Sequence, residues 1–139
     1  MKKIIYLGVF LMLFACHNKQ HSRIDFQSFI AKEGLVQKNR VFQFRFQGWQ
    51  PLDDRHLILL SSHQKSYLVR LMSSCNDLTY AFKIKLKQDF ANTLNAKFDS
   101  IIVEDPIFQE CTIHSLYEMD KTQKAALLDF ANQKDVSED

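Results

Sequence analysis

Glycine and proline are scarce in this chain, and their scarcity narrows the chemistry it can perform. Only 3 of the 139 residues are glycine and 2 are proline. A loop that wraps a phosphate group needs several glycines, because the backbone must approach the ligand closely. Nucleotide-dependent chemistry is therefore not expected. No serine lies in a Gly-x-Ser-x-Gly turn either, so the sequence lacks that signature of a nucleophilic hydrolase.

A long hydrophobic run is also missing. The longest apolar stretch is residues 4–15, interrupted only by Tyr6 and Gly8. As a helix it would rise about 18 Å, well short of the roughly 30 Å hydrocarbon core of a membrane. Two lysines precede it and the small residue Ala15 ends it, which is the layout of a secretory signal. We therefore predict that residues 1–15 are a signal peptide.

The end of this segment reads Leu13-Phe14-Ala15-Cys16 and resembles the lipobox of bacterial lipoproteins. The resemblance implies cleavage before Cys16, a diacylglycerol on its sulfur and a fatty acyl group such as palmitate on its amino group. His17 follows, where many enterobacterial lipoproteins kept in the inner membrane have aspartate. By analogy, the expected location is the periplasmic face of the outer membrane. The alternative is an ordinary secretory signal followed by a chance cysteine.

Removal of the signal abolishes the excess of positive charge. The whole chain has 18 Lys and Arg against 16 Asp and Glu, and cleavage removes two lysines, which leaves 16 of each. A net charge of zero gives no electrostatic basis for binding nucleic acid. We expect a lipidated tether at 16–23, a single globular domain at 24–135 and a frayed tail at 136–139, with no cofactor.

The number of cysteines becomes even once Cys16 carries lipid. Cys75 and Cys111 then remain in an oxidising compartment, where the simplest expectation is one structural disulfide. The alternative is a pair of redox-active or metal-binding thiols. No Cys-x-x-Cys motif supports that alternative.

Hydrophobic periodicity predicts an α+β domain. Phe26, Phe29 and Ile30 mark one face of a short helix that Gly34 can end, and Asp120 can cap a C-terminal helix. Alternating or continuous apolar residues predict about six strands, at 41–47, 57–60, 67–72, 82–87, 100–104 and 111–117. We expect one antiparallel or mixed sheet with the helices on one face. A small closed β-barrel is the alternative.

A cluster of Asp53, Asp54 and His56 follows Trp49 and is the candidate for acid–base or metal chemistry. Aspartates after Pro-Leu are also ordinary in a polar turn. The remaining histidines have no ligand spacing: His17, His21, His63 and His114. No metal site is expected from them.

Two surfaces are candidates for binding. Lys83, Lys85 and Lys87 form a basic row that can meet lipopolysaccharide, phospholipid head groups or peptidoglycan. The alternative is a solvated strand face or an edge strand protected by lysines. Phe42, Phe44 and Phe46 form an aromatic stripe that lines either an apolar pocket or the core.

The order of several short motifs is similar to a family of small proteobacterial lipoproteins known only as a domain of unknown function. The motifs are Trp49 with Leu52-Asp53, Tyr67-Leu68-Val69 with Leu71, Cys75 with Leu78, Asp99-Ser100-Ile101, and Cys111 with Ile113. The resemblance covers residues 40–118 and implies secretion, a structural cysteine pair and a common small fold. It brings no catalytic residue.

The expected function is a non-enzymatic, membrane-anchored periplasmic lipoprotein with a structural or partner-binding role in the bacterial envelope. Its partners would be the membrane, through lipid on Cys16, and an envelope protein, lipopolysaccharide or peptidoglycan. One alternative is a small-ligand-binding module that uses the phenylalanine stripe. A second is a small hydrolase or metalloprotein that uses Asp53, Asp54 and His56.

Overall fold

A computed structural model describes residues 23–104 and 107–135 as an α+β domain, as the periodicity predicts. The helices are α1 (Phe26–Glu33) and α2 (Lys121–Asp135), and a single 3-10 turn, η1, covers Leu78–Tyr80. The strands are β1 (Val36–Lys38), β2 (Arg40–Phe42), β3 (Gly48–Pro51), β4 (His56–Leu60), β5 (Ser66–Leu71), β6 (Ile84–Lys87), β7 (Thr93–Asn95), β8 (Ser100–Val103) and β9 (Gln109–Met119).

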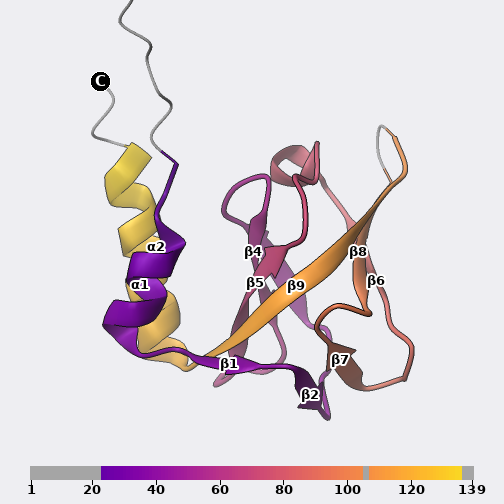
Figure 1. Cartoon of the computed structure of the whole chain (residues 1–139), viewed down its shortest axis with the longest axis horizontal. Coiled ribbons are helices and arrows are strands. Elements are labelled where there is room, and N and C mark those ends of the chain that lie inside the picture. Colours follow the sequence, from indigo (N-terminus) through magenta and orange to yellow (C-terminus); the bar gives the residue numbers. More distant parts are fainter. Residues whose placement is uncertain (1–22, 105–106, 136–139) are drawn as a thin grey trace, which may run out of the picture.

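The main sheet is antiparallel and curls into a half-barrel (Figure 1). Its six strands follow the order β3-β4-β5-β9-β8-β6, and β1 pairs with the far part of β9. The predicted hairpin of β4 and β5 is confirmed, with Leu57 opposite Val69. A separate ribbon, β2 with β7, lies below the main sheet in Figure 1. The long strand β9 therefore joins both halves of the sheet.

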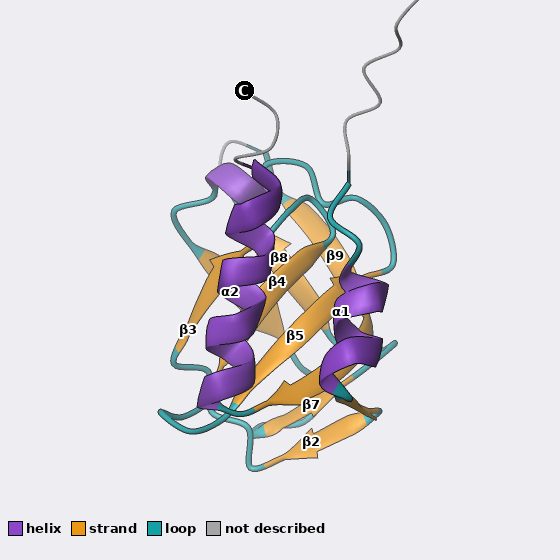
Figure 2. Cartoon of the chain, turned by 90° about the vertical axis from the view of Figure 1, so that its left-hand side faces the viewer, coloured by secondary structure: helices purple, strands orange, loops and turns teal. Residues whose placement is uncertain are grey.

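Both helices lie against one face of the sheet, as expected (Figure 2). Asp25 caps α1 by accepting from the Ser28 amide, and Gly34 ends it with a left-handed φ of 60°. The predicted cap of α2 by Asp120 is confirmed, and Gln123 completes a capping box. The Gln123 amide donates to the Asp120 carboxylate, and the Gln123 side chain accepts from the Asp120 amide.

Two apolar clusters flank the sheet. The inner core fills the concave side of the curl, and Leu59, Val69 and Ile113 are among its fully buried members. The helix-side core lies between the sheet and the helices, where Ile58 and Leu127 are fully buried. Alternate residues of β4 thus enter different cores, because successive side chains of a strand point to opposite faces. This explains why Leu57–Leu60 reads as a continuous apolar run.

The strand predicted over residues 41–47 is wrong. The strand β2 ends at Phe42, and Gln43 has a φ of 56°, which turns the chain out of the extended conformation. Phe44 is buried in the inner core, whereas Phe42 is 71% exposed and Phe46 is 40% exposed. The three side chains therefore do not form one stripe or line one pocket.

The sequence pattern does not predict three short strands: β1, β3 and β7. Each has three or four residues, too few for an alternation to stand out. The strand predicted from Phe82 begins at Ile84, and Phe82 is almost fully exposed.

Candidate functional site

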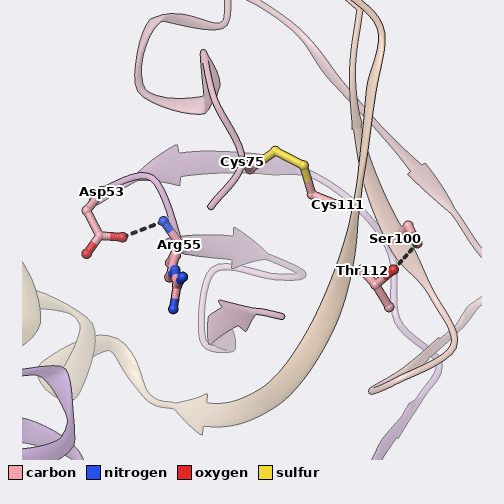
Figure 3. Close-up of a disulfide and its surroundings, with 6 residues drawn as sticks. All are labelled: Asp53, Arg55, Cys75, Ser100, Cys111 and Thr112. Atoms are coloured by element: carbon pink, nitrogen blue, oxygen red, sulfur yellow. Dashed lines mark hydrogen bonds between the residues drawn. A yellow bond between two sulfur atoms is a disulfide. The ribbon is translucent and has the colours of Figure 1, made fainter. Parts of the chain in front are cut away.

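The predicted bond between Cys75 and Cys111 is present, and the two residues are 36 positions apart in the sequence (Figure 3). Cys75 lies in the loop after β5, and Cys111 lies on β9. Both are buried in the inner core. The bond fixes the loop that carries η1 to the central strand of the sheet.

Asp53 and His56 come together at the turn between β3 and β4. One carboxylate oxygen of Asp53 accepts from the Arg55 amide at 2.7 Å and from the His56 amide at 2.6 Å. The same oxygen lies 2.9 Å from His56 Nδ1, which must carry the hydrogen because an ionised carboxylate only accepts. The first of these bonds is drawn in Figure 3. The carboxylate therefore closes the turn and orients the imidazole.

Opposing effects act on the Asp53 carboxyl. Partial burial acts to raise its pKa, while the hydrogen bond and charge of His56 and the amides of Arg55 and His56 lower it. The net result is a pKa below the usual value for aspartate. The His56 ring also stacks against Phe26 of α1, with ring centroids 4.3 Å apart. Through these contacts, the side chains of Asp53 and His56 both stabilise the local fold.

A shallow cleft of about 180 Å³ opens beside this pair. It lies between the Asp53 turn and the start of α1, and its lining is Arg23, Ile24, Asp25, Phe26, Gln27, Asp53, Asp54, Arg55, His56 and Arg70. None of these lining residues is a serine, threonine or cysteine, and neither His63 nor His114 reaches the cleft. The lining thus combines the Asp–His pair with two further carboxylates, Asp25 and Asp54, and contains no hydroxyl or thiol. The Ser74 hydroxyl lies outside the lining and accepts from Arg55 Nε at 3.2 Å.

Asp54 lines the same cleft, whereas Trp49 lies elsewhere. The backbone carbonyl of Asp54 accepts from the Cys75 amide at 2.7 Å, which ties this turn to the disulfide loop. Trp49, on β3, packs against the inner core and is therefore on the other side of the sheet from the His56–Phe26 contact. Across residues 23–104 and 107–135, no three His, Cys, Asp or Glu side chains are grouped to hold a metal ion.

A larger cleft, which the sequence did not indicate, lies at the β2–β7 ribbon. Its volume is about 460 Å³, and its walls are Asn39, Arg40, Phe42, Asn95, Ala96, Lys97 and Phe98. Arg40 Nε donates to the Asn95 side-chain oxygen at 2.6 Å, and the Arg40 guanidinium lies 5.8 Å from the centre of the Phe42 ring. Phe42 and Phe98 are both largely exposed. We call this feature the ribbon cleft.

The buried carboxylate of Asp99 fixes the position of Asn95, which lines the ribbon cleft. Asp99 is fully buried, and its side chain accepts from the amides of Asn95 and Asp89. Asn95 is itself buried and receives the bond from Arg40. The guanidinium is therefore positioned by a chain of hydrogen bonds, and Arg40 lines the cleft together with Phe42 and Phe98.

The basic row of Lys83, Lys85 and Lys87 meets opposite charges on the same surface. Lys85 bonds to Glu104, and Lys87 Nζ lies 3.0 Å from the Glu110 carboxylate. The hydrogen bonds from these lysines lower the pKa of each glutamate. β6 is the last strand of the main sheet, where lysines hinder pairing with other chains. Two of the three charges are thus compensated locally.

The expectations for residues 1–22 and 136–139 lie outside the described residues. They include the signal peptide, lipid on Cys16, His17 and His21, and the C-terminal tail. No helix in the described part of the chain is long and apolar enough to cross a membrane.

Comparison of the sequence with protein families gives a match over residues 1–135. The chain belongs to DUF6491, a family of unknown function. The match includes the N-terminal segment, the Asp53 turn, the ribbon cleft and both bridged cysteines. No curated protein and no solved structure matches the chain. Membership in DUF6491 therefore assigns a family to this domain without assigning an activity.

Proposed function

We propose that this DUF6491 protein is a non-enzymatic lipoprotein of the bacterial envelope, anchored by lipid on Cys16, whose folded domain binds an envelope partner. One observation carries the proposal. The disulfide uses Cys75 and Cys111, so the third cysteine of the chain is left directly after Ala15 at the end of the signal-like segment. A disulfide also fits an oxidising compartment, such as the periplasm.

The geometry of the Asp53 turn supports a non-enzymatic role. Asp53 closes its own turn, and the His56 ring packs on Phe26. A general base needs a positioned nucleophile or water that it can deprotonate. The residues that line the cleft beside this pair include no hydroxyl or thiol that it could deprotonate.

Mass spectrometry of the mature protein from membranes tests the anchor. We expect the first residue to be Cys16, with a diacylglycerol and an acyl group attached. The variant Cys16→Ala should lose the lipid, whereas Cys111→Ala, the control, should keep it. A mature protein that starts elsewhere, or that has an unmodified Cys16, contradicts the proposal.

The ribbon cleft favours a second candidate function, a ligand-binding module. Its positioned guanidinium suits an anionic group, and its exposed phenylalanines suit the face of a ring. Soluble peptidoglycan fragments and lipopolysaccharide are the probes for calorimetry with the purified lipidated protein. The variant Arg40→Gln should weaken binding, while Lys85→Gln on the sheet edge should not. Equal binding by both variants argues against the cleft.

A further inference from the structure

We propose that one end of the domain rests on the membrane and inserts a cluster of aromatic and aliphatic side chains into the lipid interface. This inference relies on the proposed lipid anchor at Cys16. The cluster consists of Tyr80, Phe82, Ile107 and Phe108, and we call it the apolar tip. Its members are 83%, 96%, 71% and 63% exposed, respectively.

Strand pairing brings the members of the apolar tip together. Ile84 pairs with Val103, and Val103 also pairs with Gln109 on the other side. Phe82 lies two residues before Ile84, and Phe108 directly precedes Gln109. Both therefore extend beyond the same end of three neighbouring strands. Tyr80 belongs to η1, which the disulfide loop holds at this end of the sheet.

The described chain begins at that same end of the molecule. In Figure 1, η1 and the start of β9 lie at the top, the described chain starts at the top on the opposite side of the view, and the ribbon β2–β7 lies at the bottom. Figure 2, turned by 90° about the vertical axis, also shows the described chain starting at the end opposite β2 and β7. The apolar tip and the N-terminal connection thus share one end.

The tether is too short to place the membrane at the far end of the domain. Seven residue steps separate Cys16 from Arg23, and they span at most about 25 Å when fully extended. A domain of this size measures on the order of 35 Å across. A lipid on Cys16 therefore keeps the bilayer close to the end where the chain enters the domain.

The chemistry of the apolar tip suits a lipid interface. Tyrosine and other aromatic side chains are favoured at the level of the head groups, where one end of the side chain stays hydrated. Large exposed apolar side chains grouped on one surface mark an interaction site. The nearby Glu104 is paired with Lys85, so its charge is compensated at the edge of the tip. In this orientation the ribbon cleft points away from the membrane.

Quenching of tryptophan fluorescence by brominated lipid tests the orientation. The lipidated full-length mature protein is reconstituted into vesicles of phosphatidylethanolamine and phosphatidylglycerol that contain brominated phosphatidylcholine. The variants are Phe82→Trp and Phe108→Trp, with Phe42→Trp as the matched control. The exposed fraction of Phe42 lies between those of Phe82 and Phe108, but Phe42 belongs to β2, on the ribbon at the far end. The signal of native Trp49 is subtracted using the unsubstituted protein.

We expect the added fluorescence of Phe82→Trp and Phe108→Trp to shift to the blue and to lose most of its intensity, while that of Phe42→Trp stays unquenched. If the protein floats with the vesicles but the three variants are quenched alike or not at all, the orientation is wrong and the anchor stands. If the fluorescence of Phe82→Trp and Phe108→Trp shifts to the blue without quenching, the apolar tip contacts protein, such as a second copy. That result also overturns the proposed orientation. If the protein does not float with the vesicles, the anchor itself is refuted and the orientation with it.

Discussion

Replacement of both bridged cysteines by alanine should cost the domain about 4 kcal/mol of unfolding free energy. The bond closes a loop of about 37 residues, and loop-closure entropy gives that value at 25 °C, within a range of roughly 2–5 kcal/mol for native disulfides. Alanine is the appropriate substitution because Cys75 and Cys111 are buried, where a serine hydroxyl would need a partner. For a domain of this length, losing about 4 kcal/mol of unfolding free energy corresponds to a drop of about 17 °C in Tm.

The assay is urea unfolding of the purified mature protein, followed by circular dichroism. The unsubstituted protein treated with a reducing agent is the control, because it loses the cross-link while it keeps both sulfur atoms. We expect the double variant and the reduced protein to be destabilised similarly and to unfold with a larger m value, since their unfolded states are more open. If the reduced protein is as stable as the oxidised protein, the entropic argument is refuted. If only the double variant is destabilised, the loss comes from packing instead.

Three further predictions concern single residues. Phe44→Ala should destabilise the domain by about 3–5 kcal/mol in the same assay. Phe42→Ala should change stability by about 0.5 kcal/mol or less. Similar values for the two variants would mean that both side chains are buried in the core, as one stripe of a strand would be. Gly34→Ala should cost about 1–2 kcal/mol from backbone strain alone, since a new Cβ meets nothing within 4 Å; a neutral effect on thermal unfolding would show that α1 ends differently. Asp53→Asn should reduce stability at neutral pH. The difference should begin to shrink as the pH falls below about 4, the ordinary aspartate pKa, and should vanish only below the lowered pKa of the folded state, because the carboxyl stabilises the fold only while it is ionised. A difference that is independent of pH in unfolding titrations would contradict the charge argument.

Local signals in the sequence predict most of the helices and strands. Asp120, whose side chain bonds to nearby backbone, marks the start of the C-terminal helix because a cap involves only neighbours in the chain. The run from Leu57 to Leu60 is equally informative, since both faces of that strand are covered. The ends of the Phe42–Phe46 segment are set instead by a distant partner. The Phe44 amide donates to the Asn92 carbonyl, and no periodicity within the segment encodes that contact.

The candidate sites likewise divide into those formed by neighbours in the chain, which the sequence reveals, and those formed by distant residues, which it does not. The Asp53–His56 pair lies within four residues, so its proximity is visible in the sequence, and the structure adds the ring of Phe26. The ribbon cleft joins Arg40 to Asn95 across 55 positions, and only the β2–β7 pairing brings them together. The lysine row is visible as an alternation, but its glutamate partners belong to residues 104 and 110, which the sequence does not connect to it.

The position of β9 constrains how this protein is made. Three strands pair with it: β1, β5 and β8. The residues of β1 pair with residues of β9 that lie about eighty positions later in the chain; Val36, for example, pairs with Glu118. During vectorial synthesis or export, the sheet cannot be completed until nearly the last part of the chain has emerged. The nascent chain therefore stays without its central strand for most of its passage, and the exposed strands β4 and β5 need protection from aggregation until residue 119 arrives.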